Sequence, residues 1–555
     1  MTFGETLRAS RGHPASCGRT GTSECGHSRS RSGFLSRFRL ALLLVCVFVL
    51  GASSRGDAEP LRHGPEWLPP DHPIHDDLRT LVLEGALPTR VWMLRPRTRM
   101  ELARLLAESR GDAQSWARFR VERELSAELA ELGDSASVAP VRAAAEIPIG
   151  EGTIELRPYA WLDGVWEEGE VDWGPSARAG LRGTAHLSSH LSLHEDLFIG
   201  EVPGGRRFAD AIVNHTDILL FLDEVYAGYA GSIVSARLGR MRQAWGSPID
   251  GTLLLDANAP PVDQWEVEVS LGSRARFRTV LGVLQAGAEK NLAAHRLDWS
   301  PSSGWSIGFT EGAIFRGTPL QALYVIGLVP YTIVERLHGQ DETTSQGAAQ
   351  IRNNVLYQLD VMRTGSRYAI WSAMLLDDVA TETADMPTRL GFVIGGERLL
   401  GPAGNLRFDL EAAKVYNHTY SVSYENSDWS HQRKPLGYPL GPDVERVRAG
   451  AHWQANPDWG MDGMLHLTRR GEGRIGQPWY PRDDPRAIQN PDTPAHELSG
   501  RIEQRWGGGF GVRYEPAANL RIHLETSVDW ITDRDHRLKE STPYATLRLR
   551  ALWHR

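Results

Sequence analysis

The sequence predicts a mainly β protein: a large closed antiparallel outer-membrane β-barrel of about 18 strands, preceded by a small N-terminal α-helical module. Three observations predict this fold class. An export signal stands near the start of the chain, apolar and charged residues alternate from Thr153 onward, and both short turns and long polar segments separate the alternating stretches. Alternation alone also fits a soluble β-sandwich. The export signal, the lack of cysteine in the body of the protein and the closing strand at the end of the chain favour the barrel.

Length and composition narrow the class further. The chain has 555 residues, too many for one ordinary soluble domain, and its net charge of -8 argues against a nucleic-acid partner, which would require a basic surface. Its three cysteines, Cys17, Cys25 and Cys46, all precede residue 50. The body of the protein therefore has no thiol for a disulfide, a metal or catalysis, which fits an oxidising compartment. No cofactor is expected.

Residues 1–58 are predicted to be a leader and signal peptide. Arg37 and Arg39 precede the apolar run Leu40–Leu50, and small residues follow it. A basic flank, a short apolar core and a small-residue end are typical of secretory signals, and cleavage is expected within 52–58. The apolar run is too short to span a bilayer as a helix, and no later run reaches the required length.

Residues 59–137 are predicted to form a helical module. The spacing of apolar residues predicts helices over Asp76–Glu84, Arg99–Arg110 and Trp116–Leu132. Thr98 is expected to cap the second helix through its hydroxyl. Three short amphipathic helices make a small bundle or a plug.

Residues 138–152, rich in alanine, proline and glycine, are expected to be a linker, and 153–555 to be the transmembrane barrel with its plug and surface loops. At about 10 residues per strand, the barrel region accommodates roughly 16–18 strands. The polar segments 338–353, 425–446 and 471–497 predict long loops. Apolar residues alternate with charged ones in several stretches, which include Glu155/Arg157, Arg274/Arg276/Arg278, Arg407/Asp409/Glu411, Arg521/His523/Glu525 and Arg548/Arg550.

The segment 239–261 bears the chemistry that suits a sugar. Glycines and prolines shape it as a turn. An indole can stack on the CH faces of a sugar ring, while amide and guanidinium groups meet its hydroxyls. The alternative is a bent strand whose tryptophan only packs, as isolated tryptophans usually do. The candidate binding residues here are Arg240, Arg242, Gln243, Trp245 and Asn258.

A second segment, 427–445, is a loop stiffened by glycine and proline. It carries Trp429, Arg433 and Tyr438, which suit an acidic glycan. The alternative is a loop that folds into the barrel and plugs it, and both readings are compatible.

These two segments resemble the signatures of the capsule assembly Wzi family of outer-membrane barrels. In the first, Ala244 stands where the family has a tryptophan; in the second, Tyr438 replaces a histidine. The helical module 59–137 resembles the family's periplasmic N-terminal module, which implies that it lies on the periplasmic side of the membrane. The matching residues of the first segment are Arg240, Trp245, Gly246, Leu253, Leu255, Asn258, Ala259 and Pro261, and those of the second are Leu436, Gly437, Pro439, Leu440, Gly441, Pro442 and Asp443.

The resemblance implies a lectin-like protein, not an enzyme, that binds capsular or extracellular polysaccharide and attaches it to the cell surface during capsule assembly. It implies a location in the bacterial outer membrane, with outer-membrane lipid and the barrel-assembly machinery as partners. Trp553 lies near the chain end, where barrel-assembly signals carry an aromatic residue. A monomer is expected.

Two other functions remain open. The first is a diffusion channel for sugars or anions, in which Arg274, Arg276 and Arg278 would form a basic ladder unless acidic residues balance them. The second is a barrel-embedded hydrolase of lipid or glycan that uses Asp377 and Asp378, a pair that is also a weak metal candidate. The alternative for that pair is a turn at a loop end. A His-Glu-x-x-His motif is absent from the sequence.

Overall fold

The computed structural model describes most of the chain after residue 62. The predicted leader 1–58 and its cleavage site lie outside the described residues. The described ranges are 63–109, 115–133, 143–149, 152–167, 170–200, 209–212, 218–246, 249–334, 337, 353–378, 387–401, 404–422, 426–477, 479–480, 485, 494–517, 519–538 and 540–554.

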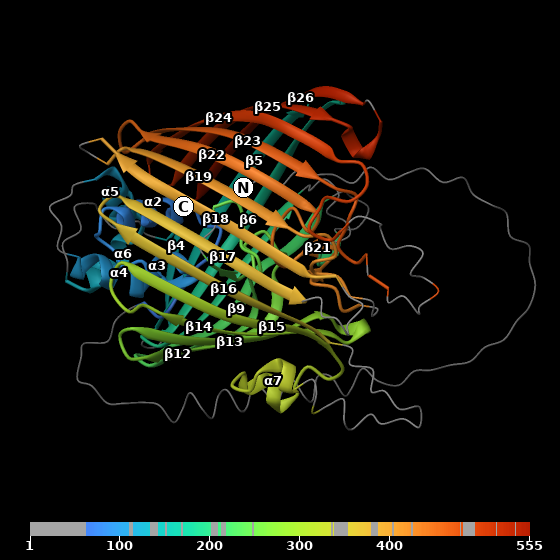
Figure 1. The fold of residues 1–555 in the computed structure, drawn as a ribbon. Helices are drawn as coiled ribbons and strands as arrows, with labels where there is room; N and C mark the ends of the chain where they lie inside the picture. The colour runs from blue at the N-terminus through green and yellow to red at the C-terminus, as the bar shows by residue number, and fades with distance from the viewer. Residues whose placement is uncertain are drawn as a thin grey trace, which may run out of the picture. The chain divides into compact units, whose positions relative to one another are not determined.

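The architecture is a closed barrel of 18 long antiparallel strands (Figure 1), which confirms the predicted fold class. Each strand pairs with the next along the chain, and β26 pairs with β5 to close the barrel. The strands are β5 (Gly152–Glu167), β6 (Glu170–Ser188), β7 (Leu191–Gly200), β9 (Leu219–Ala230), β10 (Val234–Met241), β12 (Val262–Leu271), β13 (Ala275–Gln285), β14 (Lys290–Trp299), β15 (Trp305–Arg316), β16 (Asn354–Gly365), β17 (Tyr368–Asp378), β18 (Arg389–Leu400), β19 (Leu406–Val415), β22 (Val444–Gln454), β23 (Trp459–Arg470), β24 (Glu503–Ala517), β25 (Leu520–Thr532) and β26 (Ser541–His554).

Two short strands extend this sheet. β4 (Ala145–Ile149) pairs with β5, so part of the segment expected as a linker is a strand. β8 (Ala211–Ile212) pairs with β9.

The period of two along each strand separates an ionic lumen from an apolar outer wall. On β14, Arg296 and Asp298 point inward and are buried, whereas Leu297 and Trp299 point outward and are 42% and 49% exposed. Closure satisfies the backbone hydrogen bonds of every long strand, which the bilayer core requires. The protein is therefore an outer-membrane β-barrel. None of the helices among the described residues has the length and apolarity needed to cross a membrane.

The described part of the helical module contains five short helices where three were expected. Thr98 caps α4 as predicted, because its hydroxyl accepts a hydrogen bond from the backbone N–H of Glu101 at 3.1 Å. The expected helix over 116–132 is broken at Leu125, and Arg99 donates to the Glu124 carbonyl oxygen at this break. The helices are α2 (Ile74–Leu83), α3 (Arg90–Met93), α4 (Arg99–Glu108), α5 (Trp116–Glu124) and α6 (Ser126–Glu131).

The module occupies the end of the barrel where the turns are short (Figure 1). The Thr89 hydroxyl donates to the carbonyl oxygen of Ser303 at 2.8 Å, in the turn between β14 and β15. The backbone N–H of Arg367, in the turn between β16 and β17, donates to the Leu83 carbonyl oxygen at 3.0 Å. We call this the short-turn end, and the opposite end, with the long connections, the loop end.

One loop packs on the outer wall of the barrel. It contains α7 (Ala322–Ile326), and its Tyr324 stacks on the outward-facing Phe315 with ring centroids 4.0 Å apart. The loop also covers an outward-facing pair in which His295 Nε2 lies 3.2 Å from Glu311 Oε2. Because a bare charged pair is costly in lipid, the loop supplies local shielding for these two side chains.

Candidate functional site

The two segments singled out in the sequence fold together inside the barrel. We call them the plug, defined as the described residues of loops 242–261 and 416–443. The backbone N–H of Asp256 donates to the Leu436 carbonyl oxygen at 2.8 Å, and the Tyr420 hydroxyl donates to that of Leu253 at 2.5 Å. A Cβ at Gly437 would lie 2.1 Å from the Leu253 carbonyl oxygen, so this close approach requires glycine.

An apolar core fills the lumen around these contacts. Leu253, Leu254 and Leu255 are buried in one cluster that reaches the helical module and the inward-facing Trp371. The plug is also tied to the wall, because Glu411 on β19 accepts hydrogen bonds from the backbone N–H groups at 249 and 250, at 2.8 and 2.9 Å. The plug is thus a packed part of the barrel interior.

All three predicted sugar-stacking aromatics belong to this core. Trp245, Trp429 and Tyr438 are each 0% exposed. Trp245 lies in a short strand, β11 (Ala244–Trp245), that pairs with β2 (Leu94–Arg95) of the module, and its Nε1 donates to Gln243 Oε1 at 3.1 Å. The ring faces of all three aromatics are therefore covered by protein. This arrangement matches the alternative in which the tryptophan only packs.

The predicted polar residues divide into buried and accessible ones. Gln243 is buried and donates to Glu266 in the lumen. Arg242 pairs with Asp223 through hydrogen bonds of 2.6 and 2.8 Å. Arg240 is partly exposed and bonds Asp263 at 2.6 Å, while Asn258 is exposed and donates to Asp256 at 2.8 Å.

Arg433 is the most accessible of the predicted residues of the second segment. It lies at the tip of a hairpin formed by β20 (Ser430–His431) and β21 (Lys434–Pro435), where Gln432 and Arg433 adopt φ of 49° and 66° and are both exposed. His431 Nε2 lies 3.2 Å from the Pro261 carbonyl oxygen, so the hairpin joins the first segment at the loop end. Burial lowers the pKa of His431 to about 4, which keeps its ring neutral.

A small cavity lies between the two segments. It has a volume of about 20 Å³, which holds about one water molecule and no sugar ring. The lining includes Met241, Arg242, Gln243, Leu255, Asp256, Pro260 and Leu436.

Sequence reasoning missed a group of rings at the loop end. Tyr416 and His496 have ring centroids 6.4 Å apart, those of His418 and Trp479 lie 5.4 Å apart, and Lys414 Nζ lies 5.6 Å from the Tyr416 ring. Tyr416 and Trp479 are half-buried. The signal available in the sequence was the aromatic pair at 479–480 inside a long polar loop.

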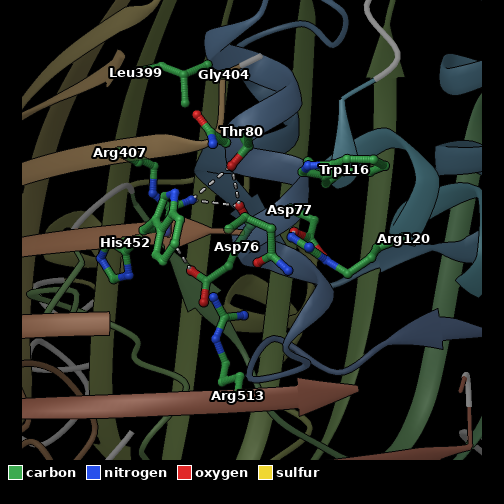
Figure 2. Close-up of a pocket in the computed structure, with 14 residues that line it drawn as sticks. Asp76, Asp77, Thr80, Trp116, Arg120, Leu399, Gly404, Arg407, His452 and Arg513 are labelled. Atoms are coloured by element: carbon green, nitrogen blue, oxygen red, sulfur yellow. Dashed lines mark hydrogen bonds and ion pairs between the residues drawn. The ribbon is translucent and has the colours of Figure 1, made fainter. Parts of the chain in front are cut away.

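A second cavity, of about 40 Å³, lies between the module and the barrel at the short-turn end (Figure 2). Charged side chains line it: Arg120 pairs with Asp77, and Arg407 donates to the Asp76 carbonyl oxygen at 2.8 Å. Burial would raise the pKa of Asp76, but Arg407 and Arg79 hold it well below its usual range. Arg407 on β19 thus joins the module to the wall through this hydrogen bond and through an ion pair with the Asp76 carboxylate at 3.6 Å.

In the acidic pair considered for metal binding or hydrolysis, the Asp377 carboxylate already bonds other groups of the protein. This buried carboxylate accepts a hydrogen bond from the backbone N–H of Tyr420 at 2.7 Å and lies 3.8 Å from Arg389. The side chain of Asp378 lies outside the described residues. Within the described part of the chain, Asp377 belongs to no group of three or more His, Cys, Asp or Glu side chains close enough to hold an ion.

Two of the three arginines considered as a basic ladder for a channel, Arg276 and Arg278, are paired with glutamates. Arg276 donates to Glu268 at 3.0 Å and to Glu101 at 2.6 Å, and Arg278 donates to Glu268 at 3.0 Å. Arg274 lies in the exposed turn before β13.

No family model matches the sequence, and no curated protein matches it. Among solved structures the chain resembles Wzi of Escherichia coli, described as an outer-membrane carbohydrate-binding β-barrel involved in group 1 capsule assembly. The identity is 14%, the TM-score is 0.58, and the match covers 87% of this chain and 98% of that one. OprD of Pseudomonas aeruginosa matches at 10% identity over 72% of this chain and 95% of its own, with a TM-score of 0.42. The similarity to Wzi supports the fold of this chain as an outer-membrane β-barrel.

Proposed function

We propose that this protein binds an acidic surface polysaccharide, capsular or extracellular, at the loop end of its barrel and holds it at the cell. In barrels of this class the long loops face outward from the cell and the short turns face the periplasm. The proposal includes membership of the capsule assembly Wzi family, which the two plug segments and the similarity to the E. coli protein support.

The observation that carries the proposal is the packed plug. A diffusion channel needs an open lumen, whereas here the interior of the described barrel holds fully buried Trp429, Tyr420 and Leu254. A closed barrel that presents a stiffened outer surface is better suited to binding than to conduction. The contacts of Asp377 likewise favour a structural role for that carboxylate over hydrolysis.

The proposed binding surface consists of accessible groups around the plug. Arg433 and Arg240 can pair with carboxylate or phosphate groups, and Asn258 can bond hydroxyls. Tyr416 and Trp479 offer rings for the CH faces of sugars. Each contact is weak, so we expect affinity to depend on many repeats of one polymer binding at once.

The test compares a variant of the proposed binding surface with a control variant at the opposite end of the barrel. Cells that produce the polysaccharide would carry the Arg433→Ala/Trp479→Ala protein, and retained polysaccharide would be measured on washed cells. We expect at least a tenfold loss, and no loss with the matched control Arg274→Ala, an exposed arginine at the short-turn end. Equal retention by all three proteins would contradict the proposed surface.

The channel alternative has its own readout. The wild-type protein, inserted in a planar bilayer, should be nearly silent if the plug stays packed. Steady single-channel conductance from the wild type would favour a diffusion channel for sugars or anions instead.

A further inference from the structure

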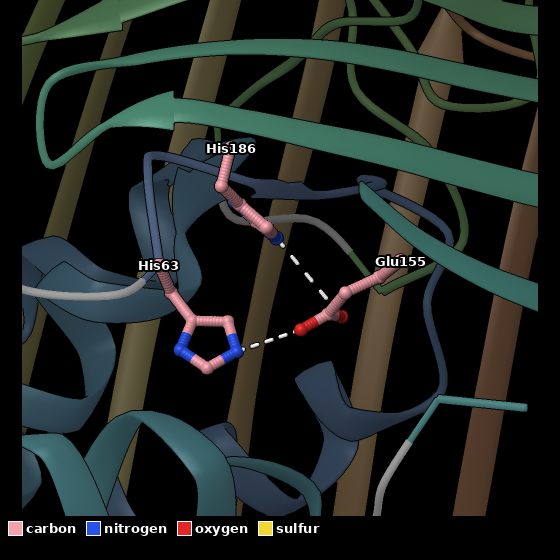
Figure 3. Close-up of side chains that lie close together, drawn as sticks. All are labelled: His63, Glu155 and His186. Carbon is pink, nitrogen blue, oxygen red and sulfur yellow. Dashed lines mark hydrogen bonds and ion pairs between the residues drawn. The ribbon is translucent and has the colours of Figure 1, made fainter. Parts of the chain in front are cut away.

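A group of metal-binding side chains lies far from the proposed binding surface, at the short-turn end of the barrel. His63 precedes the helical module, Glu155 lies on β5 and His186 lies on β6 (Figure 3). One ligand atom from each side chain lies within 4.8 Å of the others. Two strands of the wall and the segment before the module thus meet at one point.

His186 is a buried imidazole that has no hydrogen-bond partner among the described residues. It is 2% exposed, and neither of its ring nitrogens bonds another atom in that part of the chain. An unsatisfied buried polar group is costly and calls for an explanation. Its Nε2 lies 4.0 Å from Glu155 Oε2, too far for a hydrogen bond, and Figure 3 shows the ring directed at that carboxylate.

The spacing of the group suits a metal ion after small movements. His63 Nε2 lies 2.7 Å from Glu155 Oε1. In a tetrahedral site with bonds of about 2.0–2.1 Å, neighbouring ligand atoms lie roughly 3.4 Å apart. The separation of His63 Nε2 from Glu155 Oε1 would open by about 0.7 Å, and His186, whose Nε2 lies 4.0 Å from the other carboxylate oxygen, Oε2, would move toward the group.

The surroundings supply the support that metal-binding histidines usually have. Nδ1 of His63 bonds the Glu131 carboxylate of α6, which leaves Nε2 directed at the cluster. A carboxylate on the second ring nitrogen fixes the orientation of such a ligand and raises its basicity. Arg157 bonds the other oxygen of Glu155 at 2.5 Å, which holds that carboxylate in place.

We propose that His63, Glu155 and His186 bind one divalent transition-metal ion of the Zn²⁺ class. Two imidazoles and one carboxylate favour such ions over Ca²⁺ and Mg²⁺, which prefer oxygen ligands. The ion ties the segment that leads into the helical module to the wall of the barrel, so metal binding adds to the stability of the docked module.

The test uses the full exported chain without a histidine tag, folded in detergent and stripped of metal with a chelator. It would be titrated with Zn²⁺ by calorimetry and with Co²⁺ by visible absorption. We expect one ion per chain and at least tenfold weaker binding for Glu155→Gln, His186→Gln and His63→Gln. Glu131→Gln should weaken binding about 10–100-fold, as for other supporting carboxylates. The matched control is His190→Ala, an exposed histidine in the turn after β6.

A second measurement guards against misfolded variants. Heat-modifiable migration on gels reports a folded barrel, and only variants that pass it would be compared. Zn²⁺ should protect the segment around His63 from protease in the wild type and in His190→Ala, but not in Glu155→Gln. Failure of the wild type to bind Zn²⁺, or equal binding by wild type and His186→Gln, would overturn the proposal.

Discussion

The indole Nε1 of Trp429 donates a hydrogen bond of 2.7 Å to the carbonyl oxygen of Leu254. Both residues are 0% exposed, and they lie on the two different loops of the plug. The ring also rests against β15, because a Cβ at Gly312 would come within 2.6 Å of Trp429 Cη2. One side chain therefore joins both loops and the barrel wall.

Removing that side chain should loosen the plug. Trp429→Ala is expected to destabilise the protein by about 3–5 kcal/mol, because it leaves a large cavity in the core. Trp429→Phe should cost about 1–3 kcal/mol, since the Leu254 carbonyl oxygen loses its donor. Urea unfolding, followed by heat-modifiable migration, measures both. Trp459→Ala, an outward-facing tryptophan, is the control, and bilayer conductance should rise only in Trp429→Ala.

The buried cation Arg296 should be among the most sensitive residues of the lumen. It is 0% exposed and bonds Asp360 at 2.7 Å and Asp298 at 3.0 Å. Arg296→Met leaves two buried carboxylates unpaired, which should cost about 3–5 kcal/mol. Arg550→Met removes a more exposed pair with Glu525 and should cost about 1 kcal/mol or less. Similar urea midpoints for the two variants would show that burial does not set the cost.

Docking of the helical module should weaken in acid because of His75. Burial, followed by the nearby Arg95, lowers the pKa of His75 from 6.5 to about 3. Between these values the unfolded module takes up a proton that the docked module does not, so stability falls as the pH drops below about 6.5. The contribution at pH 5 is roughly 2 kcal/mol. Above pH 7, His75 is neutral in both states and adds no pH dependence to the free energy of unfolding.

The check is limited proteolysis of the module across pH 5–7.5. His75→Gln keeps a side-chain donor for the Pro69 carbonyl oxygen and should make the profile less steep, while His72, whose pKa burial also lowers to about 3, keeps the remaining slope. The exposed His190→Gln should leave it unchanged. A variant profile as steep as that of the wild type would assign the pH dependence to other groups.

The loop that contains α7 should stabilise the barrel because it covers the outward-facing His295–Glu311 pair. Tyr331 is 0% exposed and packs on His295 with ring centroids 4.6 Å apart. Tyr331→Ala should cost about 3–5 kcal/mol, by lost packing and by exposure of the His295–Glu311 pair to lipid. Replacing both His295 and Glu311 by leucine should recover part of that loss. Measured in lipid vesicles, a double-mutant cycle without such coupling would exclude the shielding role.

Local patterns determined much of the fold from the sequence. Side chains of a strand alternate between its two faces, so the stretch Arg521/His523/Glu525 could be assigned a charged face before its neighbours were known. The Thr98 cap depends on atoms three residues apart and was equally predictable. The break at Leu125 was not, because it lies beside a contact from the distant Arg99.

The sequence by itself determined strands with one apolar and one charged face and a short helical module, because strand period and helix capping are properties of neighbouring residues; the export signal was needed to turn this pattern into the prediction of a barrel. Only the tertiary structure decided that Trp245, Trp429 and Tyr438 fill the lumen while Arg433 and Asn258 stay at the surface. The physical reason is that an aromatic ring suits a protein core and a sugar equally well. Whether protein or sugar covers a given ring depends on contacts between distant loops. Tyr420 and Trp429 bond Leu253 and Leu254, which lie 167 and 175 residues away in the chain.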